Sequence, residues 1–365
     1  MDWARLRSVW KRTLSLSAPI AAETVVRTAM RTTDVLVTAL FSPAAVVAVT
    51  LGDLYARFPL RIGLGLGGGA IALSSQDTGA GETANRDEAI TQALLIGFLV
   101  GLPFAVGALL FAEPAIRLFD PSDEAIRLGA TYLGIVLVTA PARLTTLVAA
   151  RSLQGTGDTR TPMYINIFAN LINIVGSVVL GLGLLGAPEL RVAGVGYATA
   201  AANVTAATLF LGALASARTA PAFVRPRSLT ITKQLLQVSV PRTLEGLISE
   251  AAQFPFNALL LSFPAGDSVT AGFQIARRLY QQVTAPISRS FNVAASVLVG
   301  QALGEGDADR AHFECRAVAG LSVLLVWLLG ITLALAAPFA VGVFTSEPAV
   351  VEYGVAFARV YGLAG

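Results

Sequence analysis

Long apolar runs separated by short polar stretches fill the chain, and most are near the roughly 20 residues that a helix needs to cross a bilayer. This periodicity predicts helices at residues 14–40, 46–73, 89–112, 126–150, 162–186, 193–216, 234–263, 268–300, 314–342 and 350 onward. We therefore expect an all-α integral membrane protein with about ten transmembrane helices.

Composition agrees with a membrane protein and leaves little for enzyme chemistry. Of 365 residues, 55% are hydrophobic and 13% are charged, against about 25% charged in soluble domains. The single cysteine, Cys315, and the single histidine, His312, exclude a disulfide framework and a Cys- or His-rich zinc site. No Ser-His, paired-Asp or HExxH constellation is evident. We expect a protein that is not an enzyme and has no cofactor.

The Lys and Arg residues of the connections set the expected orientation. One side of the predicted helices collects twelve of them, against Arg117 and Arg191 on the other. The twelve are Arg5, Arg7, Lys11, Arg12, Arg86, Arg151, Arg160, Arg218, Arg225, Arg227, Lys233 and Arg310. The positive-inside rule then places the N-terminus in the cytoplasm of a multi-pass plasma-membrane protein. The same rule explains the formal net charge of +3 without nucleic acid as a partner.

An internal repeat organises the chain. At one constant spacing along the sequence, Ser17, Pro19, Glu23 and Phe41 match Ser239, Pro241, Glu245 and Phe263. At a second and nearly equal spacing, Gln76, Gly79, Gly81, Ala112 and Phe119 match Gln301, Gly304, Gly306, Ala337 and Phe344. With six helices between the copies, both have the same orientation, which predicts a parallel repeat about an axis along the membrane normal.

The repeat predicts two helical bundles. We expect an N-lobe of six helices at 1–216, a cytoplasmic linker at 217–233 and a C-lobe at 234–365. By the second spacing, Gly365 corresponds to position 140 of the first copy, so the second bundle is incomplete. The chain is expected to be truncated at its C-terminus relative to a two-bundle protein.

A charged stripe on the first predicted helix is the main candidate for function. Glu23, Arg27, Arg31 and Asp34 fall within about 80° of one another on a helix. Because a charge at the bilayer centre costs roughly 2.5–3.5 kcal/mol, such residues usually line a water-filled or protein-lined pathway. The alternative is a set of ion pairs that neutralise these charges, among them Glu23 with Arg27 and Asp34 with Arg31.

Other predicted helices carry further polar candidates for a substrate cavity. Asn166, Asn170 and Asn173 lie on one helical face, where their amides either converge on a cavity or satisfy interhelical hydrogen bonds. The remaining cavity candidates are Asp53, Arg57, Glu245, Glu250 and Arg278. Together with Arg27 and Arg31 they offer more guanidinium than carboxylate, and arginine binds phosphate or carboxylate bidentately.

Four segments together resemble the multidrug and toxic compound extrusion (MATE) family. They are RSLQGTGDTRTPM at 151–163, TTDVLVTALFSP around Asp34, NIFANLINIVGS at 166–177 and VAGVGYATA at 192–200. The resemblance implies a secondary antiporter that exports organic, often cationic, drug-like compounds in exchange for Na+ or H+, by alternating access between two lobes. We expect a small-molecule substrate, contact with membrane lipid and a monomer.

The resemblance also implies a cation or proton site. Asp34, Asn173 and Thr199 match an aspartate, an asparagine and a threonine of that site, and Asp34 and Asn173 are the candidate Na+ ligands. A second aspartate of the family is Ser177 here, which removes one charge. Glu23 is the candidate substitute. A proton needs one carboxylate, whereas sodium needs several oxygens together.

Two alternatives to drug export remain open at this point. The excess of arginine is compatible with a flippase or exporter of anionic or lipid-linked substrates. The incomplete second bundle is compatible with an inactive remnant.

Overall fold

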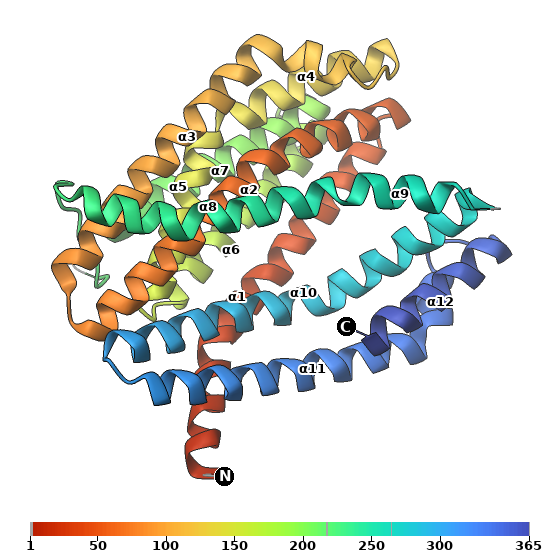
Figure 1. The fold of residues 1–365 in the computed structure, drawn as a ribbon. Coiled ribbons are helices and arrows are strands. Elements are labelled where there is room, and N and C mark those ends of the chain that lie inside the picture. The colour runs from red at the N-terminus through yellow and green to blue at the C-terminus, as the bar shows by residue number, and fades with distance from the viewer. Residues whose placement is uncertain (1–2, 217, 264, 365) are drawn as a thin grey trace. The chain divides into compact units, whose positions relative to one another are not determined.

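A computed structural model of the chain describes residues 3–216, 218–263 and 265–364, and every regular element in these ranges is a helix (Figure 1). The helices are α1 (Trp3–Ala39), α2 (Pro43–Ala80), α3 (Thr83–Arg117), α4 (Asp123–Val138), α5 (Ala140–Gly155), α6 (Arg160–Leu182), α7 (Val192–Leu214), α8 (Leu229–Ala251), α9 (Gln253–Leu261), α10 (Gly266–Gly304), α11 (Ala308–Gly342) and α12 (Pro348–Ala364). The prediction of an all-α fold is confirmed.

Two of the predicted helices are each broken into a pair. The range 126–150 becomes α4 and α5, which meet at Thr139 with a bend of 48°. The range 234–263 becomes α8 and α9, with Ala252 between them. Prolines account for both breaks, because Pro141 and Pro255 lack an N–H and would clash with the carbonyl four residues earlier. The prediction of one continuous helix in each range is therefore wrong.

Four of the described helices, α3, α6, α7 and α11, are long and apolar enough to cross a membrane. The bent pair of α4 and α5 makes a fifth span if it is counted as one. The charged stripe of α1 and the charges Asp53, Arg57 and Arg61 of α2 lower the hydropathy of those helices. Their polar faces need water or protein as a neighbour rather than lipid.

The chain divides into two compact units. We call Ala22–Leu244 with Gly300–Asp307 the N-half unit, and Met1–Ala21 with Glu245–Val299 and Ala308–Gly365 the C-half unit. These boundaries differ from the predicted lobes at 1–216 and 234–365. The start of α1 belongs to the C-half unit, whereas residues 234–244 and 300–307 belong to the N-half unit. The two-lobe division with its linker stays a prediction.

The first turns of α1 pack on α10 and α11 within the C-half unit. Leu6 and Val9 share an apolar cluster with Phe291 and Val318. The indole Nε1 of Trp10 donates a hydrogen bond to the carbonyl of Ala317 at 3.1 Å. An ion pair of 3.0 Å joins Arg12 to the buried carboxylate of Glu314, which Arg310 also contacts. Because of these contacts, residues 3–21 belong to the C-half unit, whereas the rest of α1 belongs to the N-half unit.

The internal repeat reappears as a reciprocal contact between the ends of α2 and α10. A Cβ at Gly79 would overlap the carbonyl of Gln301, and a Cβ at Gly304 would overlap the carbonyl of Gln76. Because the repeat pairs Gly79 with Gly304 and Gln76 with Gln301, each copy offers the same surface to the other, as in a two-fold contact. Both helices are followed by a left-handed glycine, Gly81 at φ 74° and Gly306 at φ 79°.

This crossing predicts different outcomes for two glycine-to-alanine substitutions. Gly79→Ala introduces a methyl group where backbone already lies, so we expect it to destabilise the fold by about 1–3 kcal/mol. Gly107→Ala on α3 is the control, since its Cβ would meet nothing within 4 Å. The measurement is the thermal unfolding midpoint in detergent. A midpoint lowered equally by both changes would contradict the crossing.

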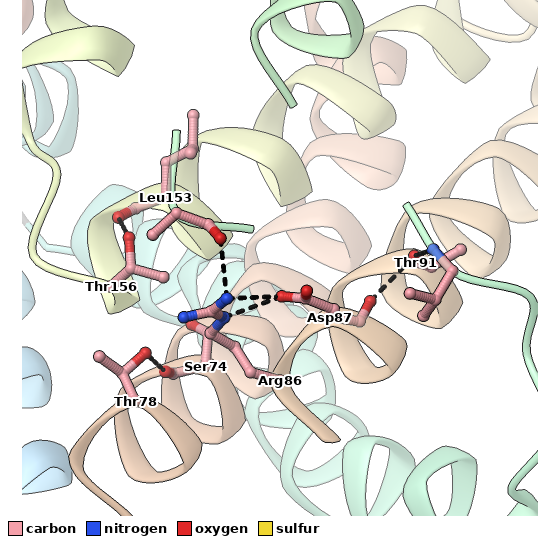
Figure 2. Close-up of polar contacts among 9 residues, drawn as sticks. Ser74, Thr78, Arg86, Asp87, Thr91, Leu153 and Thr156 are labelled. Atoms are coloured by element: carbon pink, nitrogen blue, oxygen red, sulfur yellow. Dashed lines mark hydrogen bonds and ion pairs between the residues drawn. The ribbon is translucent and has the colours of Figure 1, made fainter. Parts of the chain in front are cut away.

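Residues 218–233, the described part of the linker, lie beside the first turns of α3, whose side chains bind the linker backbone. Arg86 pairs with Asp87 at 2.8 Å (Figure 2). Arg86 also donates a hydrogen bond to the carbonyl of Ala220 at 2.8 Å. The hydroxyl of Thr91 accepts from the amide of Val224 at 3.3 Å. Glu88 accepts from the amides of Arg227 and Ser228 at 2.6 and 2.5 Å. We call these four α3 side chains, Arg86, Asp87, Glu88 and Thr91, the linker clamp.

Glu88, which precedes the apolar run of α3, makes the linker clamp sensitive to pH. Its two backbone hydrogen bonds, from Arg227 and Ser228, lower the pKa of the carboxyl below its ordinary value of 4.5. Because the pKa is lowered in the folded state, the stabilisation is complete above pH 4.5 and is lost as the pH falls through the folded pKa.

We therefore expect Glu88→Gln at pH 7 to speed hydrogen exchange at the amides of Arg227 and Ser228. Wild-type protein at low pH should show the same acceleration after correction for the intrinsic rate. Exchange is measured by mass spectrometry of linker peptides. Glu82→Gln is the control, because the Glu82 side chain makes no capping hydrogen bond. Unchanged exchange in Glu88→Gln would argue against the clamp.

Candidate functional site

The buried carboxylate of Asp34 contacts one side chain of α6. The hydroxyl of Ser177 donates a hydrogen bond to Asp34 Oδ1 at 2.6 Å, and both residues are buried. Such a bond to a charged acceptor is stronger than a neutral one. The residue at which the sequence departs from the family pattern is therefore the direct partner of Asp34.

The polar contact continues from α6 to α7. Asn173 Oδ1 lies 3.3 Å from the Ser177 hydroxyl, and its amide donates to Thr199 Oγ1 at 2.9 Å. Thr199 in turn donates to the backbone carbonyl of Val195 at 3.0 Å. Asp34, Ser177, Asn173 and Thr199 thus form one connected group, which we call the Asp34 cluster. The structure brings together these four residues as the sequence analysis expected.

Small residues let the three helices come this close. A Cβ at Gly181, one turn beyond Ser177, would lie 3.0 Å from Val37 of α1. A Cβ at Gly176 would lie 2.9 Å from the Cβ of Ala198 on α7. Larger residues at either glycine would push α6 away from α1 or α7, and the hydrogen bonds of the Asp34 cluster would lengthen.

The Asp34 cluster offers oxygen ligands with a single negative charge. Asp34 supplies the carboxylate, and Ser177, Asn173 and Thr199 supply neutral oxygens, the ligand type that hard cations prefer. Within the described residues, no group of three or more His, Cys, Asp or Glu side chains is placed to hold a metal ion. The donor set therefore fits a monovalent cation or a proton better than a divalent metal.

Glu23 does not join the Asp34 cluster. It lies eleven residues before Asp34 on α1, which is about 16 Å along a helix. Its carboxylate pairs with Arg27 at 3.4 Å, and Arg27 also reaches the hydroxyl of Thr24 at 3.2 Å. The ion pair that the sequence analysis kept as an alternative is present at this end of the stripe.

Asp53 and its neighbours form a second polar group, in which two members were missed from the sequence. Tyr132 of α4 donates a hydrogen bond to Asp53 Oδ1 at 3.2 Å. Arg143 of α5 interacts electrostatically with Arg31, Asp53 and Tyr132. An arginine inside the predicted helix 126–150 is itself a signal of a functional position, and it would have pointed to Arg143. Nothing in the sequence distinguishes Tyr132 from a core tyrosine.

Of the other cavity candidates, Arg57 is near enough to Arg31 for an electrostatic interaction. Asn166 and Asn170 are half-buried on α6, two turns and one turn before Asn173. Arg57 is exposed on α2, one turn beyond Asp53. Glu245, Glu250 and Arg278 belong to the C-half unit. The structure therefore concentrates the candidate site of the N-half unit on the Asp34 cluster and on the group around Asp53.

The block at 151–163 shapes the turn that leads into α6. Gly157 has φ 93°, a left-handed conformation that favours glycine. Asp158 Oδ1 accepts hydrogen bonds from the amides of Arg160 and Thr161 at 3.1 and 2.9 Å. Asp158 therefore satisfies the first amides of α6, the helix that carries Asn173 and Ser177.

Comparison with known proteins decides the family. The MatE family model matches residues 19–179 and 241–364. The chain belongs to the MatE family. The two matched stretches begin at Pro19 and Pro241, a pair of positions that the internal repeat already relates to each other. Family membership and the apolar helices together identify a multi-pass membrane protein.

Two multidrug resistance proteins are similar to this chain in sequence. Probable multidrug resistance protein YoeA of Bacillus subtilis is 24% identical over 278 residues, covering 73% of this chain and 59% of YoeA. Multidrug resistance protein PmpM of Pseudomonas aeruginosa is 30% identical over 322 residues, covering 85% of this chain and 65% of PmpM. The chain thus spans less than two thirds of the length of these two relatives.

A solved structure shares the fold. It is a MOP superfamily transporter from Pyrococcus furiosus, described as having a binding pocket of reverse polarity that suggests a different function. The two structures superpose with a TM-score of 0.86 at 23% sequence identity, covering 96% of this chain and 77% of the other.

The contact between Ser177 and Asp34 predicts a specific energetic coupling. We expect a double-mutant cycle of Asp34→Asn and Ser177→Ala to give a coupling energy of about 1.5–3 kcal/mol in thermal unfolding, the range for a hydrogen bond to a charged group. The control cycle replaces Ser177→Ala by Thr208→Ala, because the exposed Thr208 bonds only to its own helix. Coupling near zero for the first pair would contradict the site.

Proposed function

We propose that the protein is a secondary antiporter that exports organic, drug-like compounds in exchange for H+ or Na+, with the Asp34 cluster as its coupling site. The observation that carries this proposal is the buried carboxylate of Asp34, held between α1 and α6 by the Ser177 hydroxyl. A carboxylate in an apolar helical bundle is costly, so its presence argues for a functional use. The names of the relatives as multidrug resistance proteins agree with drug export.

The geometry suggests how the coupling ion changes the site. Ser177 has one hydroxyl hydrogen, and two acceptors lie within reach, Asp34 Oδ1 at 2.6 Å and Asn173 Oδ1 at 3.3 Å. While Asp34 is ionised, the hydrogen bond to the charge is preferred. When a proton or Na+ neutralises the charge of Asp34, this hydrogen bond weakens, and the hydroxyl of Ser177 donates to Asn173 Oδ1 instead. Ion binding at Asp34 of α1 therefore changes the hydrogen bonds of Asn173 on α6 and of Thr199 on α7.

Either coupling ion can use the cluster, but with different demands. A proton requires only Asp34, whereas Na+ requires the oxygens of Asn173, Ser177 and Thr199 around the carboxylate. Because Ser177 replaces a second carboxylate of the family pattern, the site carries one charge, which suits the transfer of one monovalent cation per cycle. No resident cofactor enters the proposal.

The remaining parts of the proposal follow from the family and from the charge distribution. We infer a monomer in the plasma membrane, with the N-terminus in the cytoplasm and two lobes that alternate access to the substrate. The positive-inside rule supports the orientation. A small-molecule substrate would lie along the polar faces of α1, α2 and α5, where Arg31, Asp53 and Arg143 interact.

A second candidate, export or flipping of an anionic or lipid-linked compound, is favoured by the excess of arginine on these faces. Arg27, Arg31, Arg57 and Arg143 stand against Glu23 and Asp53, and Glu23 is already paired with Arg27. Guanidinium groups bind carboxylate and phosphate through paired hydrogen bonds. Under this candidate Asp34 keeps its coupling role, and only the charge of the substrate differs.

The proposal predicts that export depends on Asp34. In cells expressing the chain, we expect wild type to lower the accumulation of a fluorescent organic cation and Asp34→Asn to restore it to the vector level. Asp120→Asn is the matched control, since it removes one carboxyl from a loop position with φ 47° that asparagine tolerates. Equal export by Asp34→Asn and wild type would contradict the coupling role.

Substrate charge is tested in the same cells with an anionic dye of similar size. Export of the cation but not the anion supports drug export of the family type. Export of the anion alone, lost in Arg143→Gln, supports the second candidate. In either case, Asp34→Asn is expected to lose the export that the wild type shows.

A further inference from the structure

A shallow groove lies where the linker crosses α3. It is lined by Gln92, Leu95, Ile96, Pro226, Arg227, Ser228, Leu229 and Thr232, and its volume is about 220 Å³. Drug-sized ligands occupy pockets of roughly 300–1,000 Å³. The groove is therefore too small for a whole drug-like molecule, but it has room for part of an extended chain.

The floor of the groove is apolar and continues along α3. Leu95 is 47% exposed, and the next apolar residues on the same helical face remain exposed. These residues are Phe98, Leu99, Leu102 and Val106. The stripe belongs to one of the helices that are able to cross a membrane. An acyl chain lying in the groove would therefore extend along α3 into the hydrocarbon layer.

The linker and the start of α8 add exposed apolar side chains. Phe223 is 43% exposed and Leu229 is 85% exposed. Leu229 lines the groove, and Lys233 follows one turn later on the same face of α8. Apolar side chains flanked by basic ones are typical of segments that lie at the membrane interface.

The polar end of the groove is basic. Arg227 lines the groove, and both Arg227 and Arg225, two residues earlier, are exposed. Within the described residues, neither guanidinium takes part in an ion pair. Glu88 is near enough to Arg227 for an electrostatic interaction, but its carboxylate already accepts from two backbone amides and from Gln92. The end of the groove therefore carries a net positive charge.

The linker clamp gives this arrangement a fixed shape. Arg86 binds the carbonyl of Ala220 beside its partner Asp87 (Figure 2), and Glu88 binds the amides of Arg227 and Ser228. Gln92 adds a bond to the carbonyl of Ser228 at 2.9 Å. Because the backbone is bound before and after the basic residues, their side chains can take a ligand at little further cost in entropy.

We propose that this groove binds an anionic glycerophospholipid, with the phosphate at Arg225 and Arg227 and one acyl chain against Leu95, Ile96 and Leu229. Charge complementarity selects the negative headgroup, and the apolar floor that opens onto a spanning helix selects a lipid over a soluble phosphate. The site is separate from the Asp34 cluster and does not depend on the substrate that the protein exports.

The test is the affinity of the purified chain, in a neutral detergent, for phosphatidylglycerol, read by native mass spectrometry. Arg225→Gln with Arg227→Gln should weaken binding about 30-fold, from roughly fivefold for each basic residue near a membrane surface. Arg225→Lys with Arg227→Lys should restore most of the affinity. Arg160→Gln with Arg218→Gln is the matched control, because these exposed arginines lie outside the groove.

The control pair removes the same charge and should leave the affinity within about twofold of wild type. An unchanged thermal midpoint in all variants shows that the fold is kept. Equal loss of binding in the control pair would overturn the site in favour of general surface charge. Binding of phosphatidylcholine or of glycerol phosphate as tightly as phosphatidylglycerol would also overturn it, because the groove would then recognise only the acyl chain or only the phosphate.

Discussion

The cost of burying a carboxylate among apolar helices is the constraint on which the rest of the N-half unit depends. Asp34 is accepted there because Ser177 donates a hydrogen bond to it at 2.6 Å, and because Asn173 and Thr199 continue the polar contact to α7. This arrangement requires three helices within hydrogen-bonding distance, which Gly176 and Gly181 allow. The group that we propose as the coupling site therefore also fixes the packing of α1, α6 and α7.

The two copies of the internal repeat contact each other where α2 crosses α10. Gly79 and Gly304 each accept the backbone of the other copy, so a duplicated sequence makes a self-complementary contact. The linker has no counterpart in this contact and is held differently, by polar side chains at the start of α3. Close backbone packing therefore joins the end of α2 to the end of α10, and polar side chains join the linker to the start of α3.

Much of the fold and of the Asp34 cluster followed from the sequence. The ten predicted helical ranges all fall on helices, because the length of an apolar run is a strong signal. Pro141 and Pro255 break two of these ranges, and hydropathy alone does not indicate such breaks. Asp34 was found from the charged stripe on its helix, and its grouping with Asn173 and Thr199 was found through the family resemblance. Glu23 was expected beside Asp34 because the two residues lie on the same face of a helix. A shared face does not make them neighbours, however, and three helical turns separate them. Arg143 carried a signal that was overlooked. The contact of Tyr132 with Asp53 depends on how α4 packs on α2, which hydropathy does not indicate.

The central claim is that one carboxylate, Asp34, carries the coupling charge, with the neutral side chains of Ser177, Asn173 and Thr199 forming the rest of the cluster. It is tested most directly by counting the protons that purified protein releases, with a pH indicator, when Na+ or an organic substrate is added. The account predicts up to one proton per chain for wild type, the same number for Glu23→Gln, and none for Asp34→Asn. Release that persists in Asp34→Asn, or that disappears in Glu23→Gln, would contradict it.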